Sequence, residues 1–268
     1  MSTADKLQTI YDNVELVYNA GIEAGREQGG NVEEAYNQGY TEGKENMNTL
    51  MMTAIANRSS STTAAVFSYA FFGNLWNDDL FKPTSAIKPR LFNNGLQNSN
   101  VEYGAYTDYL DFSACESLNT AFMGSKIREL GVIDARNVNQ GQNGMANAFY
   151  NCAQLERIEE FYPSNLATNK AVFQATTFGG CSALKHIVFK SEISQNGLNL
   201  KDSPLLDKES IESVINCLSA ETTGLTVKLS LDAVNKAFET SEGEKNGVTS
   251  MEWTVLAGKK TNWTICLE

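Results

Sequence analysis

Apolar side chains in the middle of the chain recur in one short pattern, Phe-x-x-Cys-x-x-Leu, whose spacing does not change. Its copies consist of Phe112, Cys115 and Leu118, then Phe149, Cys152 and Leu155, then Phe178, Cys181 and Leu184. In the last two copies the leucine opens an apolar run typical of a strand. A unit of this size cannot bury its own apolar face and becomes stable only by stacking on its neighbours. The pattern therefore predicts a solenoid of stacked turns.

The expected strands follow one another at roughly 20 to 30 residues, the period typical of leucine-rich repeats. They are centred on residues 109–112, 129–133, 157–161 and 185–190. The fold class we expect is therefore an α/β repeat, a leucine-rich-repeat solenoid with one parallel strand per repeat.

Alternation along these strands predicts which side chains point inward. The residues expected to face the core are Leu130, Val132, Ile158, Ile187, Phe189, Val227 and Leu229. The strand after Leu155 departs from the pattern, because Glu160 occupies an apolar position and Phe161 comes one residue late. We expect a bulge or a change of register at that point.

The first 57 residues carry a helical pattern, with small or apolar residues at a coiled-coil spacing. The positions expected to mediate oligomerisation are Leu7, Ile10, Val14, Val17, Gly21 and Gly25. A second helix is expected over residues 32–56. Each glycine inside these helices costs about 1 kcal/mol relative to alanine, which favours close packing against another helix. Both a hairpin packed on its own domain and an oligomerising stalk fit the pattern.

Three further parts follow this attachment segment of residues 1–57. Residues 58–110 combine a polar linker with an aromatic-rich stretch at 66–76, which we expect to cap the stack. Residues 111–206 hold the repeats. Residues 207–268 form a C-terminal repeat and a helix/strand cap, with helices expected over 208–218, 231–238 and 250–256 and strands over 225–229 and 263–267.

Composition excludes several classes of partner. The chain has 268 residues, 42% of them hydrophobic, and a formal net charge of −11. That charge disfavours binding to nucleic acid and to anionic lipid. The sequence contains no run of eighteen apolar residues, and its start lacks the pattern of a secretory signal. We expect synthesis in a cytoplasm, no membrane insertion and no export by the usual route.

The residues needed for catalysis are scarce. His186 is the only histidine, which excludes a site with several histidines, and it has no nucleophile at a recognisable motif. The five cysteines are widely spaced, and those of the repeat are expected to fill the core rather than form disulfides or a zinc site. We therefore expect no enzyme, no cofactor and no metal.

The outward strand positions form the expected ligand-contact face. These positions are Ile133, Arg157, Glu159, His186, Val188, Lys190, Thr226 and Lys228. Their mixture of charged and apolar side chains, with tyrosines at 103, 106 and 109 near one end, suits a protein or a glycan better than a small molecule.

With these repeats in place, the chain resembles the BspA-type leucine-rich repeat proteins, whose units carry the Phe-x-x-Cys-x-x-Leu and Leu-x-x-Ile-x-Phe signatures. Several segments also resemble repeat proteins encoded by bacteriophages and prophages of gut bacteria. These segments are residues 36–44, 67–83, 110–115, 131–136 and 260–267.

The resemblance implies a virion or tail-associated protein that recognises a host receptor. Its expected partners are a protein or glycan on the host surface and, through the N-terminal helices, other virion proteins and further copies of itself. The alternative is a bacterial cell-associated adhesin or an intracellular protein-interaction module that uses the same sheet.

Overall fold

The computed structural model describes residues 88–99, 102, 110–139, 144–164, 173–239 and 247–268. All of them belong to one of the chain's two compact units, which includes Ser85–Glu268. The expected helices and oligomerisation residues of the first 57 positions, the aromatic stretch at 66–76 and the tyrosines at 103, 106 and 109 lie outside the described residues.

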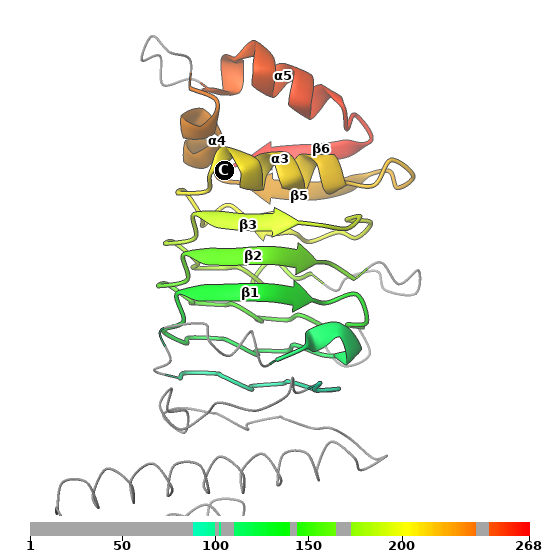
Figure 1. Ribbon diagram of the computed structural model, residues 1–268. Helices are drawn as coiled ribbons and strands as arrows, with labels where there is room; N and C mark the ends of the chain where they lie inside the picture. The colour runs from blue at the N-terminus through cyan, green and yellow to red at the C-terminus, as the bar shows by residue number, and fades with distance from the viewer. Residues whose placement is uncertain (1–87, 100–101, 103–109, 140–143, 165–172, 240–246) are drawn as a thin grey trace, which may run out of the picture. The chain divides into compact units, whose positions relative to one another are not determined.

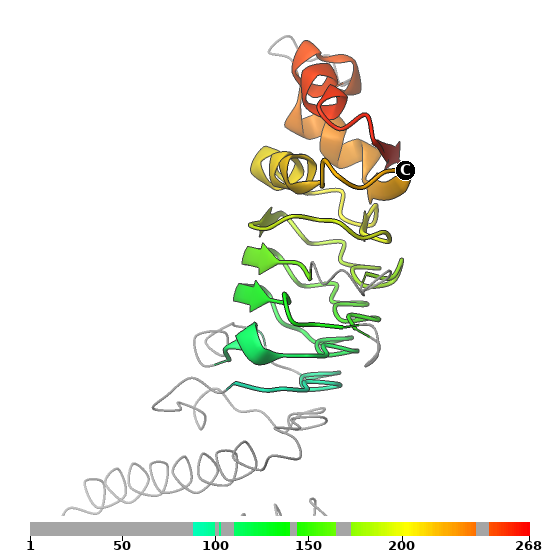
Figure 2. The same cartoon turned by 90° about the vertical axis from the view of Figure 1, so that its right-hand side faces the viewer.

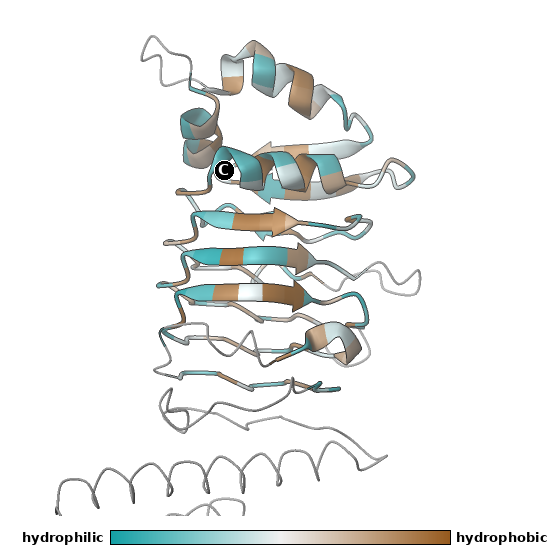
Figure 3. Cartoon of the chain, viewed as in Figure 1, coloured by the Kyte–Doolittle hydropathy of each residue, from teal (hydrophilic) through white to brown (hydrophobic). Residues whose placement is uncertain are grey.

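Three parallel strands, one from each of three successive turns, form the first sheet (Figure 1). They are β1 (Glu129–Asp134), β2 (Arg157–Tyr162) and β3 (His186–Phe189), and each pairs with the next along the chain. Leu130, Ile158 and Ile187 are in register across the sheet and all point into the core. Each strand begins with a hydrophilic band followed by a hydrophobic one, and in β2 a second hydrophilic stretch comes before the hydrophobic end (Figure 3).

The expected bulge in β2 is confirmed, because the pairing with β3 changes register between Ile158 and Phe161. The same three-residue interval also occurs in β1, where Ile133 pairs with Phe161. Ile133 is therefore fully buried and Val132 is 45% exposed, so the prediction that Val132 points inward and Ile133 outward is wrong. Strict alternation fails in β1 because its second core position stacks on Phe161, three residues after the first.

Tight turns form the other side of each coil (Figure 2). Every second amide of one turn donates a hydrogen bond to a carbonyl of the next turn. For example, the Phe122 amide donates to the Ala148 carbonyl and the Gly124 amide to the Tyr150 carbonyl, both at 2.8 Å. A residue with positive φ returns at the same place in each turn: Asn98, Gly124, Asn151 and Gly180. The rings of Phe122, Phe149 and Phe178 stack almost parallel at centroid distances of 5.2 and 5.0 Å. Repeated backbone geometry thus holds a column of aromatic rings.

The first copy of the sequence pattern is out of register with the other two. Phe122, and not Phe112, occupies the position equivalent to Phe149. Phe112 instead begins a short 3-10 helix, η1 (Phe112–Ala114), and its ring meets Phe122 edge-on at 6.1 Å. Cys115 and Leu118 are fully buried with it, so this copy fills the core from a different part of the coil.

Asp111 fixes the start of η1. Its carboxylate accepts a hydrogen bond from the Ser113 amide and lies 2.8 Å from the Lys88 ammonium. The bonds from Lys88 and Ser113 lower the pKa of Asp111 to about 2. The ionised carboxylate of Asp111 therefore stabilises the folded state.

Beyond β3 the two sides of the coil continue differently. A helix, α3 (Lys208–Cys217), packs against β3, while β4 (Asn199–Leu200), β5 (Leu225–Leu229) and β6 (Trp263–Leu267) form a second parallel sheet. The remaining elements are α4 (Leu231–Ala237), η3 (Gly247–Thr249) and α5 (Met251–Gly258). These bounds agree with the elements expected for residues 207–268. None of the helices described is both long and apolar enough to cross a membrane.

The cysteines of the repeat lie in the core as expected. Cys115, Cys152 and Cys181 are free thiols and 0% exposed. Burial raises the pKa of Cys115 and Cys152 to about 12. The Cys152 and Cys181 thiols donate to Phe122 and Phe149 carbonyls respectively, one turn away. These thiols therefore act as small fillers that also link successive turns.

Candidate functional site

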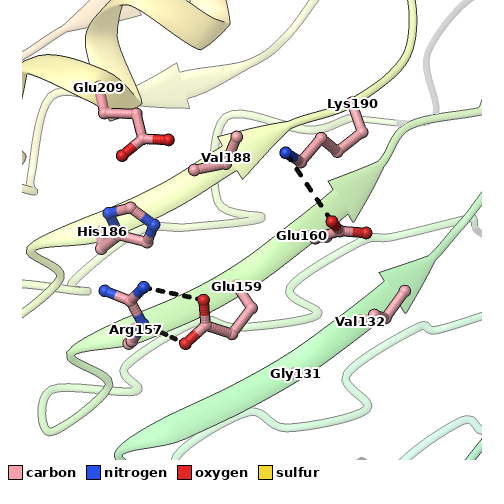
Figure 4. Close-up of a pocket in the computed structure, with 9 residues that line it drawn as sticks. All are labelled: Gly131, Val132, Arg157, Glu159, Glu160, His186, Val188, Lys190 and Glu209. Carbon is pink, nitrogen blue, oxygen red and sulfur yellow. Dashed lines mark hydrogen bonds and ion pairs between the residues drawn. The ribbon is translucent and has the colours of Figure 1, made fainter.

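The outward face of the first sheet carries a depression of about 430 Å³, which we call the sheet-face depression (Figure 4). It is lined by Gly131, Val132, Arg157, Glu159, Glu160, His186, Val188, Lys190 and Glu209. Its volume lies within the range of about 300 to 1,000 Å³ usual for ligand sites. Five of the eight residues expected on the contact face line it, namely Arg157, Glu159, His186, Val188 and Lys190.

Strand register brings these five side chains together. Arg157 and Glu159 are two residues apart on β2. His186 and Val188 have the same interval on β3, and Lys190 follows directly after the end of β3. Since Arg157 pairs with His186 across the two strands, their side chains stand next to each other on one face. Alternation therefore accounts for the shared face of these side chains, although Val188, expected to point outward, is only 7% exposed.

Most of the charged lining residues are paired with one another. The Arg157 guanidinium donates two hydrogen bonds to the Glu159 carboxylate, one of them 2.8 Å long. These bonds raise the pKa of Arg157 and lower the pKa of Glu159. At the other end Lys190 lies 3.8 Å from Glu160, which also accepts a 2.8 Å hydrogen bond from the Tyr162 hydroxyl.

His186 is more enclosed than its strand position suggests. It is 7% exposed, and its Nδ1 lies 2.7 Å from the Asp207 carboxylate. Asp207 also accepts hydrogen bonds from the amide and hydroxyl of Ser210 and so caps α3. Burial raises the pKa of Asp207, but the bonds from Ser210 and His186 outweigh burial, and the net shift is downward. The expectation of a solvent-facing histidine is wrong, because α3 packs over this end of β3.

The other three expected contact residues lie elsewhere. Ile133 is fully buried in the core. Thr226 and Lys228 belong to β5, in the second sheet, where they pair with Thr264 and Cys266 of β6. These two residues are half-buried and do not line the sheet-face depression.

The sequence reasoning missed four residues that line the depression. Gly131, Val132 and Glu160 lie between the two core positions of β1 and β2, which are three residues apart instead of two, and Glu209 comes from the first turn of α3. The late position of Phe161 carried the signal for the first group. Nothing in the repeat pattern pointed to Glu209, because it lies after the last copy.

The lining favours binding by charge pairing and apolar contact. It holds three glutamates, an arginine, a lysine, a histidine and two valines, and no serine, threonine or cysteine. Among the described residues no group of three or more histidine, cysteine, aspartate or glutamate side chains is placed to hold a metal ion. The Asp207–His186 pair joins β3 to α3, and no nucleophile is among the residues that line the depression beside it.

Comparisons of this chain with protein-family models, with curated proteins and with solved structures give no match.

Proposed function

We propose that this chain is a non-enzymatic structural protein of a bacteriophage particle that recognises a receptor on the host surface. The same proposal takes the stack of coils as a BspA-type leucine-rich-repeat solenoid. The parallel strands in sequence order and the aromatic column in register support the solenoid. The resemblance of several segments to phage-encoded repeat proteins supports a role in the phage particle.

One observation carries the binding role. Successive strands of the first sheet present one outward face with a sheet-face depression in it, lined by both charged and apolar side chains. A mixed surface of this kind is usual where proteins recognise other proteins. Positioning by a stack of packed coils also limits the entropy that such a surface loses on binding.

The binding role is tested with a matched pair of substitutions. Val132 lies in the depression and is 45% exposed, whereas Met251, on α5, is 77% exposed and not part of that lining. The labelled full-length chain is added to cells of the bacterium that the phage infects, and bound fluorescence is measured. Val132→Arg is expected to abolish cell binding and Met251→Arg to preserve it. Equal binding by both variants contradicts recognition through this face.

The presence of the chain in the phage particle is tested separately. Mass spectrometry of purified virions is expected to detect the chain in stoichiometric amounts. If the chain is found only in the infected or lysogenic cell, the alternative of a bacterial interaction module replaces the virion role.

A further inference from the structure

One charged residue in the sheet-face depression has no partner among the residues that the structure describes. Arg157 is held by Glu159, and Lys190 lies beside Glu160. Glu209, in the first turn of α3, is exposed, and its carboxylate makes no hydrogen bond or ion pair with any described residue. In Figure 4 this side chain lies above His186 and Val188, with no dashed line to a neighbour.

The charge balance of the lining has the same sign as that of the chain. Arg157 and Lys190 contribute +2 and the three glutamates −3, which leaves −1 before the adjacent Asp207 is counted. The chain as a whole carries −11. A surface of this sign attracts cationic groups and raises their association rate. The group that complements Glu209 is therefore a cation.

The apolar part of the lining narrows the kind of cation. Val188, which is 7% exposed, lines the depression together with Glu209, and Val132, which is 45% exposed, lines it from β1. Long basic side chains cover apolar surface with their aliphatic stems while the charged head reaches a polar partner. Arginine fits better than lysine, because its planar guanidinium pairs with a carboxylate through two parallel hydrogen bonds. Arginine is also enriched in the cores of protein interfaces, where lysine is depleted.

We propose that the sheet-face depression receives an arginine side chain of a protein partner. Its guanidinium pairs with Glu209, its aliphatic stem lies over Val188, and the partner's neighbouring residues cover Val132. This inference rests on the proposed function, since it names the chemistry of the partner that the same face recognises.

The test uses the isotope-labelled full-length chain and blocked tripeptides, Ac-Gly-X-Gly-NH2, followed by NMR. X is arginine, its neutral isostere citrulline, lysine or glutamate. The arginine peptide is expected to shift the amide signals of Gly131, Val188 and Glu209, with weaker shifts for lysine and none for citrulline or glutamate. Glu209→Gln should weaken arginine binding about tenfold, or about 1.4 kcal/mol, because it removes a charge-assisted pair and keeps the shape.

Glu212→Gln is the matched control. It removes one carboxylate from the same helix, one turn further along and outside the lining, and should leave arginine binding unchanged. Thermal unfolding of both variants checks that the fold is intact. Equal binding of citrulline and arginine, an unchanged affinity in Glu209→Gln, or the absence of any shift with arginine overturns the inference. Tighter binding of lysine than of arginine overturns the choice of arginine.

Failure of this inference can be told apart from failure of the proposed function. If Glu209→Gln binds host cells as well as the natural chain does, the arginine site is wrong and host recognition stands. If the natural chain binds the arginine peptide but not host cells, host recognition is wrong.

Discussion

Energetic coupling between phenylalanines tests the register of the aromatic column. The rings of Phe122 and Phe149 stack at 5.2 Å with an interplanar angle of 4°. Among the described aromatic residues, Phe112 has ring contacts with Phe92 and Phe122 and none with Phe149. If the register described above is correct, residue 149 is coupled to 122 and not to 112.

The expected magnitudes separate the two cases. Replacing a buried phenylalanine by leucine removes about three carbon atoms from the core and costs about 2 kcal/mol. A stacked aromatic pair contributes about 0.5 to 1.5 kcal/mol beyond its buried area. The Phe122→Leu and Phe149→Leu double mutant should therefore depart from additivity by about 1 kcal/mol. The Phe112→Leu and Phe149→Leu pair should be additive within about 0.5 kcal/mol.

Denaturant unfolding of the natural chain, the three single mutants and the two double mutants gives both coupling energies. The comparison uses variants with the same denaturant dependence, since a changed slope signals a changed denatured state or loss of two-state behaviour. Stronger coupling of Phe149 to Phe112 than to Phe122 would refute the observed register. It would favour the equivalence of Phe112 and Phe149 that the Phe-x-x-Cys spacing predicts.

Three further predictions concern single positions. Gly180 and Gly224 both have positive φ, but a methyl group on Gly180 would lie 2.6 Å from the side-chain oxygen of Asn151, whereas one on Gly224 has no described atom within 4 Å. In denaturant unfolding Gly180→Ala should therefore lose about 1 kcal/mol more stability than Gly224→Ala, and equal losses would contradict the clash. Burial raises the pKa of both Cys152 and Cys217, but Cys152 is fully buried and Cys217 half-buried, so iodoacetamide followed by mass spectrometry should modify Cys217 first in the native chain and both equally after denaturation. The pKa of Asp111 falls from 3.8 to about 2 on folding, so its stabilising contribution is full above about pH 4 and is lost as the pH falls toward 2; Asp111→Asn should flatten stability over that range, and an unchanged acid limb would argue against the ion pair.

Most strands and helices after residue 125 could be predicted closely from the sequence, whereas the short elements β4 and η3 were not expected. The apolar intervals around Leu130, Ile158 and Ile187 correspond to neighbouring strands in register. The expected helix over 208–218 is observed as Lys208–Cys217. These segments follow from local periodicity and capping residues, which depend little on the rest of the chain.

Register was harder to predict, because identical spacing does not ensure an equivalent position. Phe149 and Phe178 are followed two residues later by Asn151 and Gly180, residues that tolerate the positive φ of the turn. Phe122 is followed in the same way by Gly124, whereas the residue two after Phe112 is an alanine. The sequence thus held the signal for the correct register in the turn residues rather than in the Phe-x-x-Cys spacing.

The site combines a repeated surface with the place where the repetition ends. In the described part of the chain no fourth strand pairs with β3. The amides of Ile187 and Phe189 donate instead to the hydroxyls of Ser210 and Ser213, at 2.9 and 3.1 Å. These serines allow a helix to take the position of the next strand without leaving the edge amides unpaired.

The replacement of a further strand by α3 also determines the chemistry of the sheet-face depression. A fourth repeat would place another outward strand residue beside Val188, whereas α3 brings the carboxylate of Glu209 over the sheet and encloses His186 through Asp207. The stacked strands supply the paired charges and the valines of the lining, and α3 supplies Glu209, an acid with no partner among the described residues. The Phe-x-x-Cys pattern could therefore predict the outward face of the first sheet. It could not predict Glu209, the residue that selects the ligand on that face.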